Sequence, residues 1–219
     1  MTDGPAAASG AFPAEPVVLV VEDDPSIRDA LRRLFATVGR TVLTFGSAAE
    51  LLESKLPDVP SCLVLDIRLP GRSGLDLQSE LASAGVRIPI VFMTGHGDIP
   101  MTVRAMKAGA ADFLTKPFRD QDMLDAVAAA IEQDSRRRVD EQAVRRLQAR
   151  YDLLTPRERE VMALATKGLM NKQIAWELGL SEITVKIHRG RLMKKMQARS
   201  LAELVHMADS LGVRPAEAP

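Results

Sequence analysis

The sequence has few of the features that stabilise secreted or membrane-bound proteins. Cys62 is the only cysteine among the 219 residues, so no disulfide can form within the chain. No apolar run approaches the roughly 20 residues of a membrane-spanning helix. The first basic residue is Arg28, so the N-terminus lacks the basic region of a signal peptide. These absences argue against an extracellular disulfide-rich fold and predict a cytoplasmic protein with no membrane partner.

Aromatic residues and net charge are also scarce. Aromatics make up 4% of the chain and hydrophobic residues 46%, which suits ordinary globular α or α/β domains. The formal net charge is zero, but it is unevenly distributed. Residues 1–131 hold 12 Lys and Arg against 17 Asp and Glu, whereas residues 132–219 hold 17 against 12. The basic second part is therefore expected to bind a polyanion.

Five short apolar runs alternate with amphipathic stretches in the first 131 residues. The runs cover residues 17–21, 41–45, 62–65, 90–93 and 112–115. Apolar strands that alternate with helices predict an α/β domain, with a parallel sheet covered by helices on both faces. Beyond residue 131 the runs stop and the pattern becomes helical, which predicts a separate all-α domain.

These patterns divide the chain into five parts. They are a disordered N-terminal extension (1–16), an α/β domain (17–131), a helical linker (132–150), an all-α domain (151–212) and a flexible tail (213–219). Apolar residues with 3–4 spacing lie near the end of the linker, at Val144, Leu147, Tyr151 and Leu154. The linker is therefore either a short coiled coil or a solvated single helix.

Three consecutive acids follow the first apolar run, where unpaired carboxylates near a core would be costly. Asp24 precedes Pro25, which is typical of a capping residue followed by proline at the first helical position, so we assign Asp24 to the helix. Glu22 and Asp23 remain at the carboxyl end of the predicted strand. Their charge needs compensation by a cation, a helix N-terminus or water.

Further polar residues stand at the ends of the later runs. Asp66 ends the third run, Thr94 ends the fourth and Lys116 follows the fifth. Ligands of an open parallel sheet bind beyond the carboxyl ends of its strands, so we expect these groups to meet Glu22 and Asp23. A single aspartate at a strand end is commonly only a cap or a solvated loop residue. The ordered series on successive strand ends makes a shared site the better interpretation.

The chemistry of these groups suits phosphoryl transfer. Carboxylate oxygens are ligands for Mg²⁺, which binds one or two carboxylates together with water and phosphate oxygens. Asp66 can act as a nucleophile toward a phosphoryl group, and Lys116 can pair first with Asp66 and then with phosphoryl oxygens. Thr94 can donate a hydrogen bond to such an oxygen, and Phe113 can exchange between outward and inward positions in response.

Three segments resemble the receiver domain of response regulators. They are VVEDDPSIRDAL, CLVLDIRLPGRSGLDL and VFMTGHGDIPMTVRAMKAGAADFLTKPF, within residues 17–131. The resemblance implies a flavodoxin-like fold with five parallel strands in the order 2-1-3-4-5. It also implies that Asp66 is the phosphoacceptor and that the bond between Lys116 and Pro117 is cis.

The same resemblance gives each of the other site residues a role. These roles are the Mg²⁺-binding pair Glu22 and Asp23, the metal-binding backbone carbonyl of Arg68, the switch pair Thr94 and Phe113, and the family's lysine at Lys116. Glu22 departs from the Asp that is common at its position. Because Glu is one methylene longer, it binds the metal either directly or through water, and both alternatives stay open.

The basic part shows the pattern of a helix-turn-helix. The predicted caps and the turn fall at Thr155, Asn171, Gly179, Ser181 and Ser200. Two helices joined by a short turn suit a DNA-binding motif whose second helix enters the major groove. In that helix, 3–4 spacing predicts a core-facing row that comprises Val185, His188, Leu192 and Met196.

Residues on the other face of this helix, and at the helix starts, are predicted to contact DNA. The predicted contacts are Asn171, Lys172, Ser181, Thr184, Lys186, Arg189, Gly190 and Lys194. Glycine inside a helix costs about 1 kcal/mol relative to alanine. Gly190 therefore either allows the backbone to approach DNA closely or makes no base contact.

The stretch from LTPRERE (154–160) to LMKKM (192–196) resembles the LuxR/NarL-type effector domain. Together the two resemblances indicate a response regulator of the FixJ/NarL type. The segments GHGDIPMTVRAMKAGA and GLMNKQIAWELG favour its FixJ-like branch. The resemblance implies that a sensor histidine kinase phosphorylates Asp66 and that residues 99–130 then form a homodimer. The dimer would bind promoter DNA, act on RNA polymerase and regulate transcription, with activation the favoured outcome.

Two alternatives come from other classes of protein. In the first, the protein binds DNA independently of phosphorylation and uses the receiver only as a dimer scaffold; the intact Asp23, Asp66 and Lys116 argue against it. In the second, the protein is an enzyme that transfers phosphoryl groups to metabolites. That activity needs a substrate pocket and a lid, for which the short predicted loops leave no room, so we expect no enzyme.

Overall fold

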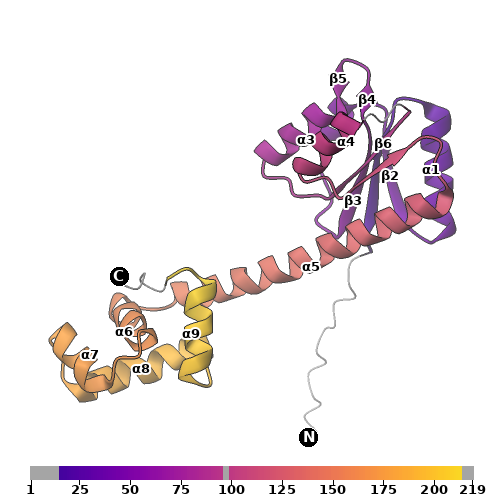
Figure 1. Ribbon diagram of the computed structural model, residues 1–219. Helices are drawn as coiled ribbons and strands as arrows, with labels where there is room; N and C mark the ends of the chain where they lie inside the picture. Colours follow the sequence, from indigo (N-terminus) through magenta and orange to yellow (C-terminus); the bar gives the residue numbers. More distant parts are fainter. Residues whose placement is uncertain (1–14, 96–98, 214–219) are drawn as a thin grey trace, which may run out of the picture. The chain divides into compact units, whose positions relative to one another are not determined.

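The computed structural model describes residues 15–95 and 99–213 (Figure 1). The chain separates into two compact units, residues 1–138 and 139–219. The predicted N-terminal extension and C-terminal tail fall almost entirely outside the described residues. Among the helices that the structure describes, none is both long and apolar enough to cross a bilayer.

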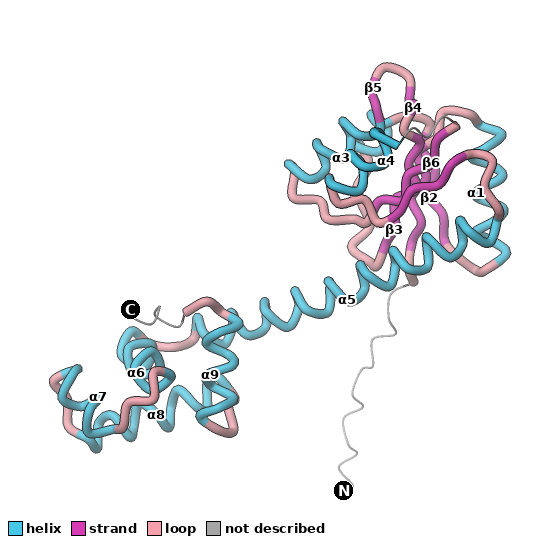
Figure 2. Tube along the Cα trace, in the orientation of Figure 1, coloured by secondary structure: helices cyan, strands magenta, loops and turns pink. Residues whose placement is uncertain are grey.

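The first unit contains a five-stranded sheet in which every pair of neighbouring strands is parallel (Figure 2). Its strands are β1 (Val17–Val21), β2 (Thr41–Phe45), β3 (Ser61–Asp66), β6 (Ile90–Thr94) and β7 (Asp112–Thr115). The order is β2-β1-β3-β6-β7, in which β6 and β7 are the fourth and fifth strands of this sheet. It therefore confirms the predicted flavodoxin-like order 2-1-3-4-5. The central strands are buried throughout, as their unbroken apolar runs predict.

Helices cover both faces of the sheet and form two separate cores. One face packs against α1 (Pro25–Thr37) and α5 (Asp120–Asp152). The other packs against α2 (Ala48–Glu53), α3 (Gly74–Ser83) and α4 (Ile99–Lys107). The two short strands β4 (Arg68–Leu69) and β5 (Arg72–Ser73), which we did not predict, form a small hairpin after β3.

The acidic run after β1 divides as predicted. The Asp24 carboxylate caps α1, because its Oδ1 accepts hydrogen bonds from the backbone N–H groups of Ser26 at 2.7 Å and Ile27 at 3.4 Å. These hydrogen bonds lower the pKa of Asp24, and the bond from Ser26 has the larger effect. Asp24 is therefore committed to the helix, and Glu22 and Asp23 remain for the strand edge.

Residues 132–150 are helical, as predicted, but they are not a uniformly solvated helix. They belong to α5, and Asp134 on this helix is fully buried. One Asp134 oxygen accepts the backbone N–H of Ser61 at 3.0 Å and Nε of Arg138 at 2.7 Å, and the other bonds Arg137. Arg138 also contacts Asp58 at 2.7 Å. This polar cluster ties α5 to the first residue of β3.

The second unit is helical, as predicted. It contains α6 (Pro156–Thr166), α7 (Asn171–Leu178), α8 (Glu182–Met196) and α9 (Leu201–Ser210). Helix α6 packs against α8 and α9, and α7 packs against α8. The core row of α8 is confirmed for Val185, Leu192 and Met196, which are buried, while His188 is half-buried.

Three of the four predicted caps in this unit are confirmed, at Thr155, Ser181 and Ser200. The prediction that Asn171 caps α7 was wrong. Met170 occupies the cap position, and the Gln173 side chain accepts the Met170 backbone N–H at 2.8 Å. Asn171 is already inside the helix, which leaves its side chain available for a contact elsewhere.

Candidate acidic site and nucleic-acid interface

The sheet brings the predicted acidic site together at its carboxyl edge. Strands β1, β3, β6 and β7 are consecutive neighbours in the sheet. In register, Val21 pairs with Leu65, Asp66 with Met93, and Thr94 with Thr115. Residues that end these strands therefore meet along one edge. The Lys116–Pro117 peptide bond is cis, as the resemblance implied.

Lys116 joins the two buried acids of this edge. Its Nζ lies 2.6 Å from Oε2 of Glu22 and 2.6 Å from Oδ2 of Asp66. Glu22 is only 1% exposed and Asp66 only 7%, so neither carboxylate has bulk water to compensate its charge. Of the three kinds of compensation that the sequence left open, a cation, a helix N-terminus or water, the chain itself supplies a cation, Lys116.

Burial and pairing act in opposite directions on the charges of this site. Burial raises the pKa of Glu22, because it outweighs the hydrogen bond from Lys116 that favours the carboxylate. Burial alone would lower the pKa of Lys116, but its hydrogen bonds to Asp66 and Glu22 outweigh burial and raise it. Lys116 is therefore held as a cation between the two acids.

The same edge has a donor set that fits a hard divalent cation. Glu22, Asp23 and Asp66 each offer one carboxylate oxygen, and these oxygens lie within 4.8 Å of one another. Asp23 is exposed while the other two are buried, so the cluster opens to solvent on one side. Three oxygen ligands with room for water match the preference of Mg²⁺. The Arg68 backbone N–H donates to Oδ1 of Asp66 at 2.9 Å, which holds the start of β4 beside the cluster.

Thr94 lies on β6, the neighbour of β3, and Phe113 lies on β7, the next strand along the sheet. Thr94 is fully buried at the end of β6, and its backbone carbonyl accepts the Lys116 N–H at 2.7 Å. Phe113 pairs in register with Phe92 and is half-buried against the core that contains α2, α3 and α4. Both residues are placed where a movement at the strand ends would reach them.

Two residues that support the acidic edge were missed from the sequence. Nη1 of Arg28, on α1, donates to the backbone carbonyls of Glu22 at 2.6 Å and Asp23 at 2.9 Å, which fixes this turn. Gly74 opens α3 against β3, and a Cβ there would lie 2.5 Å from the Asp66 carbonyl oxygen. The sequence could have predicted this close approach, because a glycine is the first residue of the helix that follows the strand ending at Asp66.

The second unit contains the predicted helix-turn-helix. Helix α7 ends at Leu178 and is followed by Gly179, whose φ of 64° is left-handed; α8 begins after Ser181. Ser181 Oγ accepts the Thr184 backbone N–H at 3.1 Å and shares a hydrogen bond with Thr184 Oγ1 at 2.8 Å. Four other predicted DNA contacts are exposed: Lys172, Lys186, Gly190 and Lys194.

The two remaining predicted contacts bind each other. Nη1 of Arg189 donates to Oδ1 of Asn171 at 2.7 Å, which links α8 to α7, and both side chains are half-buried.

Lys195, the residue after Lys194, is not exposed in the way that Lys194 is. Nζ of Lys195 contacts Oε2 of Glu158 at 2.6 Å and the Leu153 carbonyl at 3.0 Å, so this lysine anchors α8 to the start of α6.

Sequence patterns did not identify two apolar residues on the surface of α8. Ile183 is 74% exposed and Ile187 is 49% exposed. They are four residues apart and therefore lie on the same face of the helix. The sequence could have indicated this exposure, because both isoleucines lie outside the predicted core-facing row that contains Val185, Leu192 and Met196. Apolar side chains of this kind can contact thymine methyl groups in a major groove.

Both units match known families. The family model of the response regulator receiver domain matches residues 18–128, and that of bacterial regulatory proteins of the luxR family matches residues 152–208. Nodulation protein W of Bradyrhizobium diazoefficiens is 62% identical over 197 residues, covering 90% of this chain and 87% of that protein. The transcriptional regulatory protein FixJ of Azorhizobium caulinodans is 43% identical, covering 91% and 95%.

Solved structures show the same architecture. The response regulator StyR matches with a TM-score of 0.82 and 50% identity over 90% of this chain and 99% of that one. Full-length FixJ from B. japonicum matches with a TM-score of 0.55 and 39% identity over 91% and 98%. The proteins of this family are regulators rather than enzymes, a receiver domain implies a sensor kinase, and a LuxR-type domain implies DNA. The chain belongs to the two-component response regulators that join a receiver domain to a LuxR-type DNA-binding domain and regulate transcription.

Proposed function

We propose that Asp66 accepts a phosphoryl group from a sensor histidine kinase. The main support is the contact of Lys116 with both Glu22 and Asp66 at the carboxyl edge of the sheet, within 2.6 Å of each. Because Asp66 is only 7% exposed, little of its carboxylate is open to an incoming phosphoryl group. The Asp66 carboxylate oxygen attacks the phosphorus, the phosphorus–nitrogen bond breaks, and the electron pair stays on the kinase imidazole.

The residues around Asp66 divide the work of stabilising charge. The Lys116 ammonium group can move from the two carboxylates toward the phosphoryl oxygens, because these oxygens also carry negative charge. Glu22, Asp23 and Asp66, with the Arg68 carbonyl, would hold Mg²⁺, which neutralises charge on the transferring group when it is bound. Glu22 is buried and already hydrogen-bonded to Lys116, which favours a role through water over direct metal contact.

The response to phosphorylation begins at the neighbouring strands. The Thr94 hydroxyl donates to a phosphoryl oxygen, and Phe113 moves inward as the end of β6 shifts. The surface of residues 99–130 then becomes the homodimer contact. Helix α4 supports this assignment, since Ile99, Val103 and Met106 are exposed apolar residues at 3–4 spacing on one face.

The dimer binds promoter DNA with two copies of α8 and activates transcription through RNA polymerase in the cytoplasm. Lys186 and Gly190 lie on the exposed face of α8 and approach base edges, and Lys172 and Lys194 contact phosphates. The bond of Asn171 with Arg189 links the two helices of the motif, and the bond of Ser181 with Thr184 caps α8; all four residues present polar groups to the DNA backbone.

Size-exclusion chromatography with Mg²⁺ tests the phosphorylation-dependent dimer. Beryllofluoride, which mimics a phosphoryl group on a carboxylate, should convert the protein to a dimer and raise its DNA affinity. Asp66→Asn should abolish both effects, while Asp76→Asn, a change on α3 outside the acidic edge, should preserve them. An unchanged oligomeric state and an unchanged DNA affinity would refute the proposal and favour a receiver that serves only as a scaffold.

A further inference from the structure

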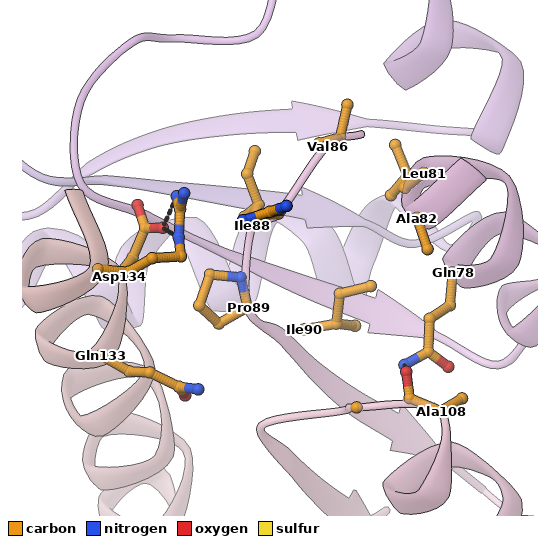
Figure 3. A pocket seen from close by; sticks show the side chains of 13 residues that line it. Gln78, Leu81, Ala82, Val86, Ile88, Pro89, Ile90, Ala108, Gln133 and Asp134 are labelled. Atoms are coloured by element: carbon orange, nitrogen blue, oxygen red, sulfur yellow. Dashed lines mark hydrogen bonds and ion pairs between the residues drawn. The ribbon is translucent and has the colours of Figure 1, made fainter. Parts of the chain in front are cut away.

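Two large apolar side chains on the surface of α8 take no part in the core of the second unit. Ile183 is 74% exposed and Ile187 is 49% exposed, and neither belongs to the hydrophobic cluster that holds the four helices together. By contrast, the partly exposed Arg137 of the receiver is paired within the chain, since it bonds Asp134 in the groove between α3 and α5 (Figure 3). Isolated apolar residues are common on protein surfaces. The meaning of the two isoleucines therefore depends on which residues share their face of α8.

The isoleucines belong to a stripe along α8 on the side away from the core. An α-helix turns by about 100° per residue, so residues 183, 187, 190 and 194 fall within about 60° of one another. All four are exposed, and we call them the outer stripe: Ile183, Ile187, Gly190 and Lys194. The buried Val185 and Leu192 lie on the opposite side. Because the outward face of the second helix of a helix-turn-helix enters the major groove, the outer stripe comes nearest to the base edges.

Gly190 leaves a gap in this stripe that the protein itself does not need. Glycine is among the least favourable residues inside a helix. A Cβ at Gly190 would meet no described atom within 4 Å, and the backbone there is not in the left-handed region. Neither packing nor backbone conformation therefore requires a glycine. The missing side chain, one turn after Ile187, lets a surface outside the domain approach the α8 backbone closely.

The chemistry of the outer stripe selects one kind of base contact. Its first three members have no side-chain hydrogen-bonding group, so they can read a base only by apolar contact. Thymine is the base that presents an apolar group, its C5-methyl, in the major groove. Arg189 does not belong to the stripe, and its guanidinium is bonded to Asn171 at 2.7 Å. Readout by this part of α8 therefore favours thymine.

The spacing of the isoleucines sets the spacing of the thymines. Four residues of an α-helix span about 6 Å along its axis, and successive base pairs are about 3.4 Å apart. A helix that lies along the groove therefore brings its two isoleucines to base pairs about two steps apart.

We propose that Ile183 and Ile187 determine the sequence specificity of α8. They contact the C5-methyl groups of two thymines about two base steps apart in its half-site, and Gly190 provides the clearance that brings them there. This inference rests on the proposed DNA binding and names the bases that the helix selects.

Substitution of single thymines by uracil tests the proposal, because uracil lacks only the methyl group. The DNA is a duplex selected by the whole, phosphorylated chain from a random library, and each of its thymines is replaced in turn. Uracil at either of two positions should weaken binding about fourfold, the value of one buried methyl, and uracil elsewhere should have no effect. At the same two positions, 5-methylcytosine should bind about fourfold more tightly than cytosine. The scan uses the unaltered protein, so it does not require any variant to fold.

Variants then assign each thymine to its residue. Ile183→Ala should remove the effect of uracil at one of the two positions, and Ile187→Ala should remove it at the other. Leu153→Ala, which shortens an exposed apolar side chain outside α8, should leave both effects unchanged. A selected site whose affinity no uracil alters, or uracil effects that persist in both isoleucine variants, would overturn this inference and leave DNA binding intact. Failure to select any site would overturn the proposed DNA binding, and this inference with it.

Discussion

Adjacent lysines on α8 should respond in opposite ways to the same substitution. Lys195 contacts the buried carboxylate of Glu158 at 2.6 Å, whereas Lys194 is exposed and is proposed to contact DNA. Lys195→Gln should therefore destabilise the DNA-binding domain. Lys194→Gln should leave its stability unchanged within about 0.5 kcal/mol and should weaken DNA binding instead.

The size of the effect at Lys195 follows from burial. Breaking a fully buried ion pair by removing one partner costs about 3–5 kcal/mol. The side chain of Glu158 is 2% exposed but that of Lys195 is 34% exposed, so water screens the pair on one side. Glu158 also keeps its hydrogen bonds with Thr155. We therefore expect a loss of about 2 kcal/mol.

Hydrogen exchange measured by mass spectrometry separates this domain from the receiver. Peptides of α6 that contain Val161 and Met162, both buried, should exchange about 30-fold faster in Lys195→Gln at pH 7, because each 1.4 kcal/mol is tenfold. Lys194→Gln should exchange like the wild type, while its DNA affinity falls and the slope of log affinity against log salt decreases by about one.

The stability difference between wild type and Lys195→Gln should decrease as the pH falls. Burial alone would raise the pKa of Glu158, but the hydrogen bonds from Lys195 and Thr155 outweigh burial and lower it. Stability from this carboxylate is present above its unfolded pKa of about 4.3 and is lost as pH falls through the lower folded pKa. The difference between wild type and Lys195→Gln should therefore vanish in acid. An equal difference at pH 7 and in acid, or a larger effect of Lys194→Gln on stability, would refute this reasoning.

Three further predictions concern the rest of the chain. Gly74→Ala should slow phosphorylation of Asp66 by acetyl phosphate and destabilise the receiver by about 1–3 kcal/mol, measured by urea unfolding, because its Cβ would meet the Asp66 carbonyl oxygen at 2.5 Å. Asp134→Ala should cost about 3–5 kcal/mol in receiver stability, whereas Asp58→Ala, whose side chain is fully exposed, should cost less than about 1 kcal/mol. Gly190→Ala should stabilise α8 by about 1 kcal/mol, since a Cβ there meets nothing among the described residues, yet weaken operator binding in a gel-shift titration.

The acidic edge could be predicted from the sequence because it depends on local patterns. Unbroken apolar runs locate the strand ends, and the parallel sheet brings those ends to one side. Asp66, Thr94 and Lys116 therefore lie on neighbouring strands, as expected. The pairing of Lys116 with Asp66 was expected, but the sequence did not show that the same ammonium group would also bond Glu22, which lies 94 residues away in the chain.

Other features depended on packing that no local pattern specifies. Asp134 stands in a charged stretch typical of a solvated helix, but it meets the Ser61 backbone from 73 residues away. Lys194 and Lys195 are separated by one helical step of about 100°. Only the position of α6 decides which of the two is anchored to Glu158 and which is exposed.

Operator selection from a random DNA library tests the central claim most directly, because it measures phosphorylation and DNA recognition together. The protein is incubated with Mg²⁺ and acetyl phosphate, and the affinity for the selected site is compared between wild type and Asp66→Asn. We predict that wild type gains one phosphoryl group by intact mass and binds at least about tenfold more tightly when phosphorylated, a coupling of about 1.4 kcal/mol. Asp66→Asn should show neither change. Equal phosphoryl gain in both proteins, or an affinity that phosphorylation leaves unaltered, would contradict the assignment of Asp66 as the switch.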